Sequence, residues 1–390
     1  MQLILREGDM ENFPLLRDAE LKPAVKILTD YPRDDLASDE VHQALVTACA
    51  HHGVNPYNLD VGAIPGMDTV VAGFKTAQLA LNSKLGFGHV IHTNCAPRKN
   101  IVTAESKGEG VVLGILPNGV CLLTVSSGYS LAPFRPMIED GSVKFFKTRI
   151  PDAGSQFRSR DYFPDATARL ARYLQDRMRA LGPSEIYNLL AENKADKILE
   201  NFEYIAEPMD LSHFTPLPQG SVCYIDNFGN IKLNIPHDDL VEQYEPGTIL
   251  AVSIGDTIVD AIVGTAGFSQ GEGILALTRG SSGWMQGANN IRFTEIFLRG
   301  ESAANVFKSV KPGSQIQVLA KKDLQDCIKL IQESGHSTIG TLNLYMFSES
   351  HLVQLLAIEG LIEDGYKTDK LKNAISNGSI VNILSGAEAA

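Results

Sequence analysis

The sequence has no run of lysine or arginine and no long uninterrupted apolar stretch. Its 390 residues hold 46 acidic against 34 basic side chains, a formal net charge of −12. An acidic chain without a basic run argues against a nucleic-acid or anionic-membrane surface, and no apolar segment is long enough to span a bilayer. The N-terminal MQLILREGDMENF also lacks the apolar core of a signal peptide. We therefore expect a cytoplasmic protein.

Cysteine is scarce and scattered. The five cysteines form no Cys-x-x-Cys pair, so the sequence predicts neither a zinc site nor a disulfide framework, and no metal is expected. Cys49, Cys121 and Cys223 stand among apolar neighbours, as small core residues do. Cys95 differs because it lies in a polar loop, where either a reactive thiol or an incidental residue fits.

Apolar runs alternate with helical patterns in the first half of the chain, which is typical of an α/β sheet. The expected strands are AVKILTD, NLDVGAI and HVIHTN, and the expected helices EVHQALVTACAHHG, TVVAGFKTAQLALNSKLG and ATARLARYLQDRMRAL. We expect a strand pair around Pro117–Gly119 and an inserted helical connection over 185–210. Residues 1–208 are thus predicted to form an α/β domain with a mostly parallel sheet and flanking helices.

The pattern changes at Gly220 to short β runs separated by glycine. This spacing predicts an all-β antiparallel barrel or sandwich over 209–321. From Lys322 the apolar spacing is helical again. Residues 322–390 are therefore predicted to form a helical C-terminal extension.

The stretch VCYIDNFGNIKLNI, residues 222–235, combines two β runs with an unusual turn. Asn and Gly are common in tight hairpins because they tolerate positive φ. This turn also carries the carboxylate of Asp226, the ring of Phe228 and the carboxamide of Asn230. Such a set suits a flat polar heterocycle, although an ordinary turn contains the same residue types.

This stretch resembles the start of the C-terminal domain of the S-adenosylmethionine hydroxide adenosyltransferases (S-adenosylmethionine hydrolases), relatives of the fluorinase and chlorinase. Further segments resemble the family in the same order over roughly residues 25–320: ILTDYPRDD, NLDVGAIPGMDTVVAGFKTAQLAL, LPNGVCLLTV, FRSRDYFPDATARLA, LALTRGSSGWM and FTEIFLRGESAANVF. The resemblance implies that the α/β domain of residues 1–208 binds a nucleoside, and that the protein is a homotrimer whose subunits share the S-adenosylmethionine sites. It implies no cofactor beyond this substrate.

The resemblance implies substrate-binding roles for six residues: Asp30, Asp226, Phe228, Asn230, Ser281 and Arg299. Asp30 corresponds to the aspartate that holds the ribose hydroxyls. Asp226, Phe228 and Asn230 correspond to residues around the adenine and the methionine ammonium. Ser281 corresponds to the serine on the methionine carboxylate, for which Arg299 is the candidate cation.

The residues at the family's water-activating positions differ in this sequence. The hydrolases use an aspartate, an arginine and a histidine to activate water; here Asn94 takes the aspartate position and Arg158 the histidine position. Neither serves as a base at neutral pH. Arg98 stands nearer to Asn94 than the family's arginine does to its aspartate, and Ser159 resembles the halogenases' halide-binding serine. His92 is either a substitute base or a structural strand histidine.

Three functions remain open at this stage. The first is cleavage of S-adenosylmethionine at C5′ by water, which gives adenosine and L-methionine. The second is a catalytically weak or inactive protein that binds S-adenosylmethionine or adenosine. The third is adenosyl transfer to another anion such as a halide, which Ser159 and the arginines favour.

Overall fold

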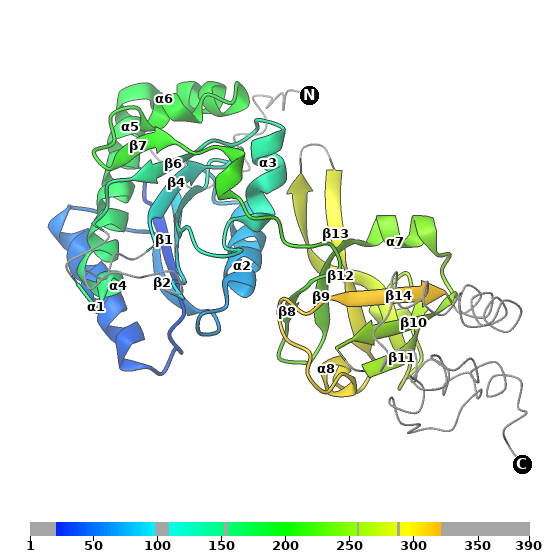
Figure 1. Cartoon of the computed structure of the whole chain (residues 1–390). Helices are drawn as coiled ribbons and strands as arrows, with labels where there is room; N and C mark the ends of the chain where they lie inside the picture. The colour runs from blue at the N-terminus through cyan, green and yellow to red at the C-terminus, as the bar shows by residue number, and fades with distance from the viewer. Residues whose placement is uncertain (1–20, 98–108, 152–154, 256, 287–288, 321–390) are drawn as a thin grey trace, which may run out of the picture. The chain divides into compact units, whose positions relative to one another are not determined.

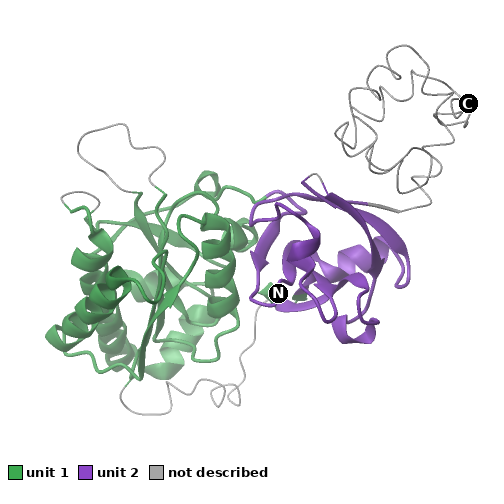
Figure 2. Ribbon diagram, turned by 90° about the horizontal axis from the view of Figure 1, so that it is seen from below, with its two compact units in different colours: residues 1–217, 283–291 green, residues 218–282, 292–390 purple. Residues whose placement is uncertain are grey.

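The computed structural model describes residues 21–97, 109–151, 155–255, 257–286 and 289–320. The chain divides into two compact units: unit 1 is Met1–Leu217 with Gly283–Ile291, and unit 2 is Pro218–Ser282 with Arg292–Ala390 (Figure 2). Arg98 and the expected helical extension over 322–390 lie outside the described residues. No helix in the described part of the chain is long and apolar enough to cross a membrane.

Unit 1 is built on a seven-stranded sheet of order β2-β1-β3-β5-β4-β6-β7 (Figure 1). Its strands are β1 (Ala24–Thr29), β2 (Asn58–Ala63), β3 (His89–Asn94), β4 (Val111–Ile115), β5 (Cys121–Val125), β6 (Phe145–Thr148) and β7 (Ile205–Pro208). Strands β2, β1, β3 and β5 run parallel, whereas β4 is antiparallel to both β5 and β6. The mostly parallel sheet is therefore confirmed, and so is the strand pair around Pro117–Gly119.

The helices of unit 1 begin at recognisable caps. The Asp35 side chain accepts a hydrogen bond from Ala37 N at the start of α1 (Leu36–His51), and Asp68 caps α2 (Thr69–Leu81) in the same way. The long α5 (Phe163–Ala191) is kinked at Gly182. The shorter elements are η3 (Ala132–Phe134), α3 (Arg135–Glu139), α4 (Arg158–Asp161), α6 (Ala195–Leu199) and η4 (Leu211–His213).

One expectation for unit 1 needs correction. The connection over 185–210 is helical only as far as Leu199 at the end of α6, and it then forms β7 on the sheet edge. Backbone hydrogen bonds from Arg149 N to Tyr204 O (2.8 Å) and from Met209 N to Phe145 O (2.8 Å) hold it there. A four-residue strand is too short to show alternation beside a strong helical pattern.

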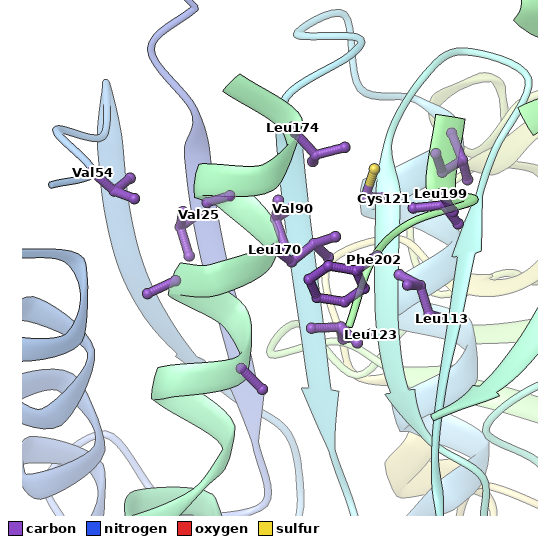
Figure 3. Close-up of a cluster of buried hydrophobic side chains, with 14 of the residues drawn as sticks. Val25, Val54, Val90, Leu113, Cys121, Leu123, Leu170, Leu174, Leu199 and Phe202 are labelled. Carbon is purple, nitrogen blue, oxygen red and sulfur yellow. The ribbon is translucent and has the colours of Figure 1, made fainter. Parts of the chain in front are cut away.

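Helices cover both faces of the unit 1 sheet. Leu170 and Leu174 of α5 lie over Val90, Leu113 and Leu123 on one face (Figure 3), and α1 packs beside α5. Figure 1 shows α2 and α3 on the opposite side of the sheet. The chain thus leaves β1 through α1 on one face, and it returns from β2 through α2 on the other to reach β3. The strand order consequently reverses between β1 and β3.

Unit 2 is built on a seven-stranded sheet of order β14-β10-β11-β12-β13-β9-β8, in which the end of the β12–β13 pair, Gly283–Ile291, is counted with unit 1. Its strands are β8 (Val222–Ile225), β9 (Ile231–Pro236), β10 (Ile249–Ile254), β11 (Thr257–Val263), β12 (Leu275–Gln286), β13 (Asn289–Leu298) and β14 (Ile316–Ala320), with α7 (His237–Gln243), η5 (Gly267–Ser269) and α8 (Ala303–Val306) between them. A bridge between Ser221 and Gln315 joins the two sheet edges, so the sheet is a nearly closed barrel.

The sequence predicted a purely antiparallel barrel, and this is wrong at one strand pair. Strands β11 and β12 pair in parallel, with Ile262 opposite Ala276 and Val263 opposite Leu277. Parallel neighbours need a connection that carries the chain back to the starting end. The glycine-rich loop over 264–274, which includes η5, provides that return. Its glycines resemble those of hairpin turns, which explains the error.

Candidate functional site

Asp30 and Asn94 lie side by side at the carboxyl edge of the unit 1 sheet. Asn94 ends β3, Asp30 follows β1 directly, and Asp30 N donates to Asn94 O at 3.2 Å. Ligands of open α/β sheets bind outside the carboxyl ends of the strands where the strand order reverses. Strands β1 and β3 flank that point. The fold therefore places both predicted residues where a nucleoside site is expected.

Arg158 and Ser159 belong to the same edge. His92 of β3 contacts Thr167 near the start of α5, so the N-terminal ends of α4 and α5 lie toward the carboxyl ends of the strands. Ser159 is 4% exposed, and its Oγ lies 2.8 Å from the hydroxyl of Tyr31. The sequence analysis missed Tyr31, although its position directly after Asp30 was a usable signal.

The guanidinium of Arg158 is almost fully buried. It donates from Nη2 to the backbone oxygen of Glu109 at 2.9 Å, and it lies 5.1 Å from the centre of the Phe163 ring. Arginine keeps its proton in proteins, so this group is a permanent positive charge beneath the site edge. It suits an anion, and it opposes the protonation of any base beside it.

His92 is a poor candidate for a base. The Thr167 hydroxyl donates its one hydrogen to Phe163 O at 2.7 Å, so His92 Nδ1–H must be the donor in the 2.7 Å contact with Thr167 Oγ1. Nε2 is then a lone-pair acceptor, and it has no hydrogen-bond partner within the described residues. Complete burial and the charge of Arg158 lower the pKa of His92 to about 3. The ring is therefore neutral at physiological pH, in agreement with the structural interpretation.

Cys95 is an inert thiol in this structure. It is 1% exposed, and burial, reinforced by the carboxylates of Asp30, Asp68 and Glu109, raises its pKa to about 12. A thiol with this pKa does not form the nucleophilic thiolate near neutrality. The described ranges contain no group of three or more His, Cys, Asp or Glu side chains placed to hold a metal ion. Metal-free chemistry stays a prediction.

The turn between β8 and β9 in unit 2 is organised by Asp226. Oδ1 accepts from Phe228 N and Asn230 N, each at 3.0 Å, and Oδ2 accepts from the Asn230 side chain at 3.0 Å. Burial alone would raise the pKa of Asp226. The hydrogen bonds from Asn230 and the ammonium of Lys232 outweigh burial and hold this pKa below its usual value. The carboxylate is therefore ionised and fixed in direction.

Two phenylalanine rings of unit 2 face solvent. Phe228, held by the Asp226 turn, is 81% exposed, and Phe268 of η5 is 82% exposed with its ring 5.6 Å from that of Phe297. An exposed ring on an ordered backbone offers a stacking surface for a flat ligand at small entropic cost. The sequence analysis did not single out Phe268, although a lone aromatic in the loop GTAGFSQGEG was a signal.

Ser281 and Arg299 are far apart on unit 2. Ser281 is exposed on β12, and its backbone oxygen accepts from Arg292 Nη1 at 3.0 Å. Arg299 lies beyond the far end of β13, about 23 Å from Arg292 at ~3.3 Å per strand residue. There its Nη1 donates to Gln270 O at 3.1 Å, in the loop that carries Phe268. The cation beside Ser281 is thus Arg292.

Gly229→Ala is expected to destabilise unit 2 by about 2–3 kcal/mol. Gly229 has a φ of +81°, and a Cβ there would collide with Ser302 Oγ. The positive φ alone costs about 1–2 kcal/mol, and the collision adds to it. Urea denaturation followed by circular dichroism measures the loss.

Gly247→Ala is the matched control. Gly247 also has a positive φ (+96°), but a Cβ there meets nothing within 4 Å. Gly247→Ala should lower the free energy of unfolding only by the cost of the positive φ, about 1–2 kcal/mol. Equal losses in the two variants would show that Ser302 does not constrain the turn.

The amino-acid sequence of unit 2 matches a known family. Residues 220–317 match the family model of the SAM hydroxide adenosyltransferase C-terminal domain. No match was found among proteins of curated function.

Two solved structures resemble the chain. An uncharacterized conserved protein from Thermotoga maritima is 16% identical, with a TM-score of 0.51 over 76% of this chain and 100% of that chain. A conserved hypothetical protein from Thermus thermophilus is 18% identical, with a TM-score of 0.46 over the same shares. At 16% identity the first likeness shows the fold alone. Over residues 220–317 the family match confirms the resemblance drawn from the sequence: this part of the chain is similar to the C-terminal domain of the SAM hydroxide adenosyltransferases.

Proposed function

We propose that the chain binds S-adenosylmethionine and cleaves it at ribose C5′ with water, giving adenosine and L-methionine. The observation that carries this proposal is the family match over residues 220–317, which includes the ordered Asp226 turn and its exposed Phe228 ring. The carboxyl edge of the unit 1 sheet supports it independently, because Asp30 lies at the strand-order reversal.

Each proposed contact follows from the chemistry of its side chain. The Asp30 carboxylate accepts from the two ribose hydroxyls, and the Phe228 ring stacks on adenine. Asp226 accepts from the methionine ammonium. Ser281 donates to the methionine carboxylate, and Arg292, its neighbour on β13, supplies the opposite charge. Asn230 holds Asp226 in place through its side-chain hydrogen bond.

The proposed reaction needs little acid chemistry. A water oxygen bonds to C5′ as the C5′–sulfur bond breaks, and the electron pair of that bond neutralises the sulfonium. Methionine therefore leaves as a neutral thioether, and the only proton released comes from water. The protein's task is to align the water, the C5′ atom and the sulfur.

A specific observation favours a second function, that of a binding protein with little turnover. Asn94 is not a base, Arg158 stays charged, and His92 is neutral and fully buried. None of these three side chains is therefore suited to take the proton of water, and the carboxylate of Asp30 at the same edge is assigned to the ribose hydroxyls. Tyr31 and Ser159 instead form a hydroxyl pair suited to holding water or an anion. Transfer to a halide is therefore tested alongside hydrolysis.

The assembly and compartment are also proposals. We propose a homotrimer on the basis of the family resemblance, and a cytoplasmic location on the basis of an acidic sequence without a long apolar stretch. Light scattering on dilute protein tests the assembly, and a monomer mass would contradict shared sites.

The wild-type protein is expected to bind S-adenosylmethionine and to convert it slowly into adenosine and methionine. Purified protein is incubated with S-adenosylmethionine, with and without fluoride or chloride, and products are identified by mass spectrometry. Calorimetry on the same sample measures binding. Binding without products would favour the binding protein, and a halogenated nucleoside would favour transfer to halide. Absence of binding to either S-adenosylmethionine or adenosine would refute the proposal.

A further inference from the structure

Lys232 and Glu295 form an ion pair on the outer side of the barrel, next to Asp226. Lys232 of β9 stands opposite Glu295 of β13 in the antiparallel ladder, and its Nζ lies 2.6 Å from Glu295 Oε2. The neighbouring Ile231 and Leu233 point the other way, into the core. The lysine therefore approaches the Asp226 turn from the side opposite the core.

The same ammonium is shared with Asp226 at a longer distance. Lys232 Nζ lies 3.4 Å from Asp226 Oδ2, against 2.6 Å to Glu295. Glu295 itself is confined, because a Cβ on Gly280 of β12 would lie only 3.0 Å from its Oε2. Lys232 is thus paired mainly with Glu295, and the charge of Asp226 is only partly neutralised.

The charges of this cluster do not balance. The side chains of Lys232, Glu295 and Asp226 are 8%, 9% and 20% exposed, and they comprise two carboxylates and one ammonium. These three side chains form no further ion pair within the described residues. The hydrogen bonds to Asp226 keep its carboxylate ionised, so this net charge of −1 can pair with one further cation. The arrangement is complementary to a ligand with one positive group.

We propose that Glu295 is a positioning residue that holds Lys232 away from Asp226, so that Asp226 is available to the cationic methionine end of S-adenosylmethionine. This rests on the proposed function. Without the Glu295 charge, Lys232 moves onto Asp226, and the ligand's ammonium must compete with it. Adenosine lacks that ammonium and is not affected. The cluster therefore sets the preference for S-adenosylmethionine over adenosine.

Glu295→Gln tests this inference through the ratio of two affinities. Calorimetry at fixed salt should show about 10-fold or more weaker S-adenosylmethionine binding, the scale of one charge-assisted contact. Adenosine affinity should change less than about threefold, the usual context-dependent scatter of a single interaction. Lys232→Met should shift the ratio toward S-adenosylmethionine, and Lys232→Met/Glu295→Gln should restore it. Because Lys232→Met acts in the opposite direction, it tests the idea even if Glu295→Gln does not fold.

The outcomes separate this inference from the proposed function. Equal loss of both ligands in Glu295→Gln, or an unchanged ratio in Lys232→Met, would overturn the positioning role while leaving the proposed function intact. Absence of binding of either ligand to the wild type would overturn the proposed function itself. Circular dichroism checks that each variant is folded, since Lys232 and Glu295 lie on paired strands of the unit 2 sheet.

Discussion

The double variant Asn94→Asp/Arg158→His is expected to hydrolyse S-adenosylmethionine about 10²- to 10⁴-fold faster than the wild type, the usual contribution of a positioned base. Asn94 ends β3 beside Asp30, so a carboxylate there would stand at the site edge. Replacing Arg158 removes the buried positive charge that opposes a base and introduces an imidazole. Adenosine release, followed by chromatography, measures the gain.

The loss of a hydrogen bond made by Arg158 limits this gain in turnover. Arg158 donates to the backbone oxygen of Glu109, and a histidine leaves that acceptor without this donor. Asn94→Asp and Arg158→His are therefore made singly as controls, and each should give less turnover than the pair. Negligible turnover in all of them, with tight ligand binding retained, would contradict the catalytic proposal and leave a binding protein. Brisk wild-type hydrolysis that is lost in His92→Ala would show that His92 acts as a base despite its burial.

Asp226→Ala is expected to weaken S-adenosylmethionine binding by about 100-fold. The carboxylate accepts two backbone hydrogen bonds and one from the Asn230 side chain, so its loss also loosens the turn. Losing a charge-assisted contact costs about 1.5–3 kcal/mol, and each 1.4 kcal/mol is tenfold in affinity. Adenosine binding should fall too, because Phe228 no longer has an ordered backbone beneath it. Calorimetry with both ligands measures the two losses.

Phe228→Ala separates stacking from charge. Loss of the Phe228 ring should weaken the binding of both ligands alike, by about tenfold, since stacking of a base on an aromatic ring contributes about 1–3 kcal/mol. Tyr57→Ala is the matched control, because Tyr57 is 69% exposed but precedes β2 at the amino edge of the unit 1 sheet. Unchanged affinity in Phe228→Ala, or an equal loss of affinity in Tyr57→Ala, would show that the Phe228 ring does not stack on the ligand.

The elements that the sequence predicted well are those with strong local periodicity. Strands β1, β2 and β3 and helix α2 begin where their patterns indicated, whereas α1 begins at Leu36, before the predicted Glu40, because Asp35 caps it. Asp30 and Asn94 meet because parallel neighbours end at one edge, a consequence of strand order rather than of sequence distance.

What the sequence could not supply depends on pairing between distant segments. The parallel contact of β11 with β12 and the edge strand β7 arise from partners that local periodicity does not encode. The same holds for Arg292 beside Ser281 and Tyr31 beside Ser159, since the sequence shows none of these side-chain neighbours. The burial of His92, which decides its charge, likewise becomes visible only in the packed structure.

The position of the unit 1 site at strand ends has an evolutionary consequence. Val90 and Ile91, within β3, are fully buried and hold the sheet together, whereas Asn94 stands at the end of the same strand. Selection for folding and selection for chemistry thus act on different residues of one strand. A group at the end of such a strand can be exchanged without re-engineering the interior. Such an architecture lets catalysis be lost, regained or redirected while the scaffold persists.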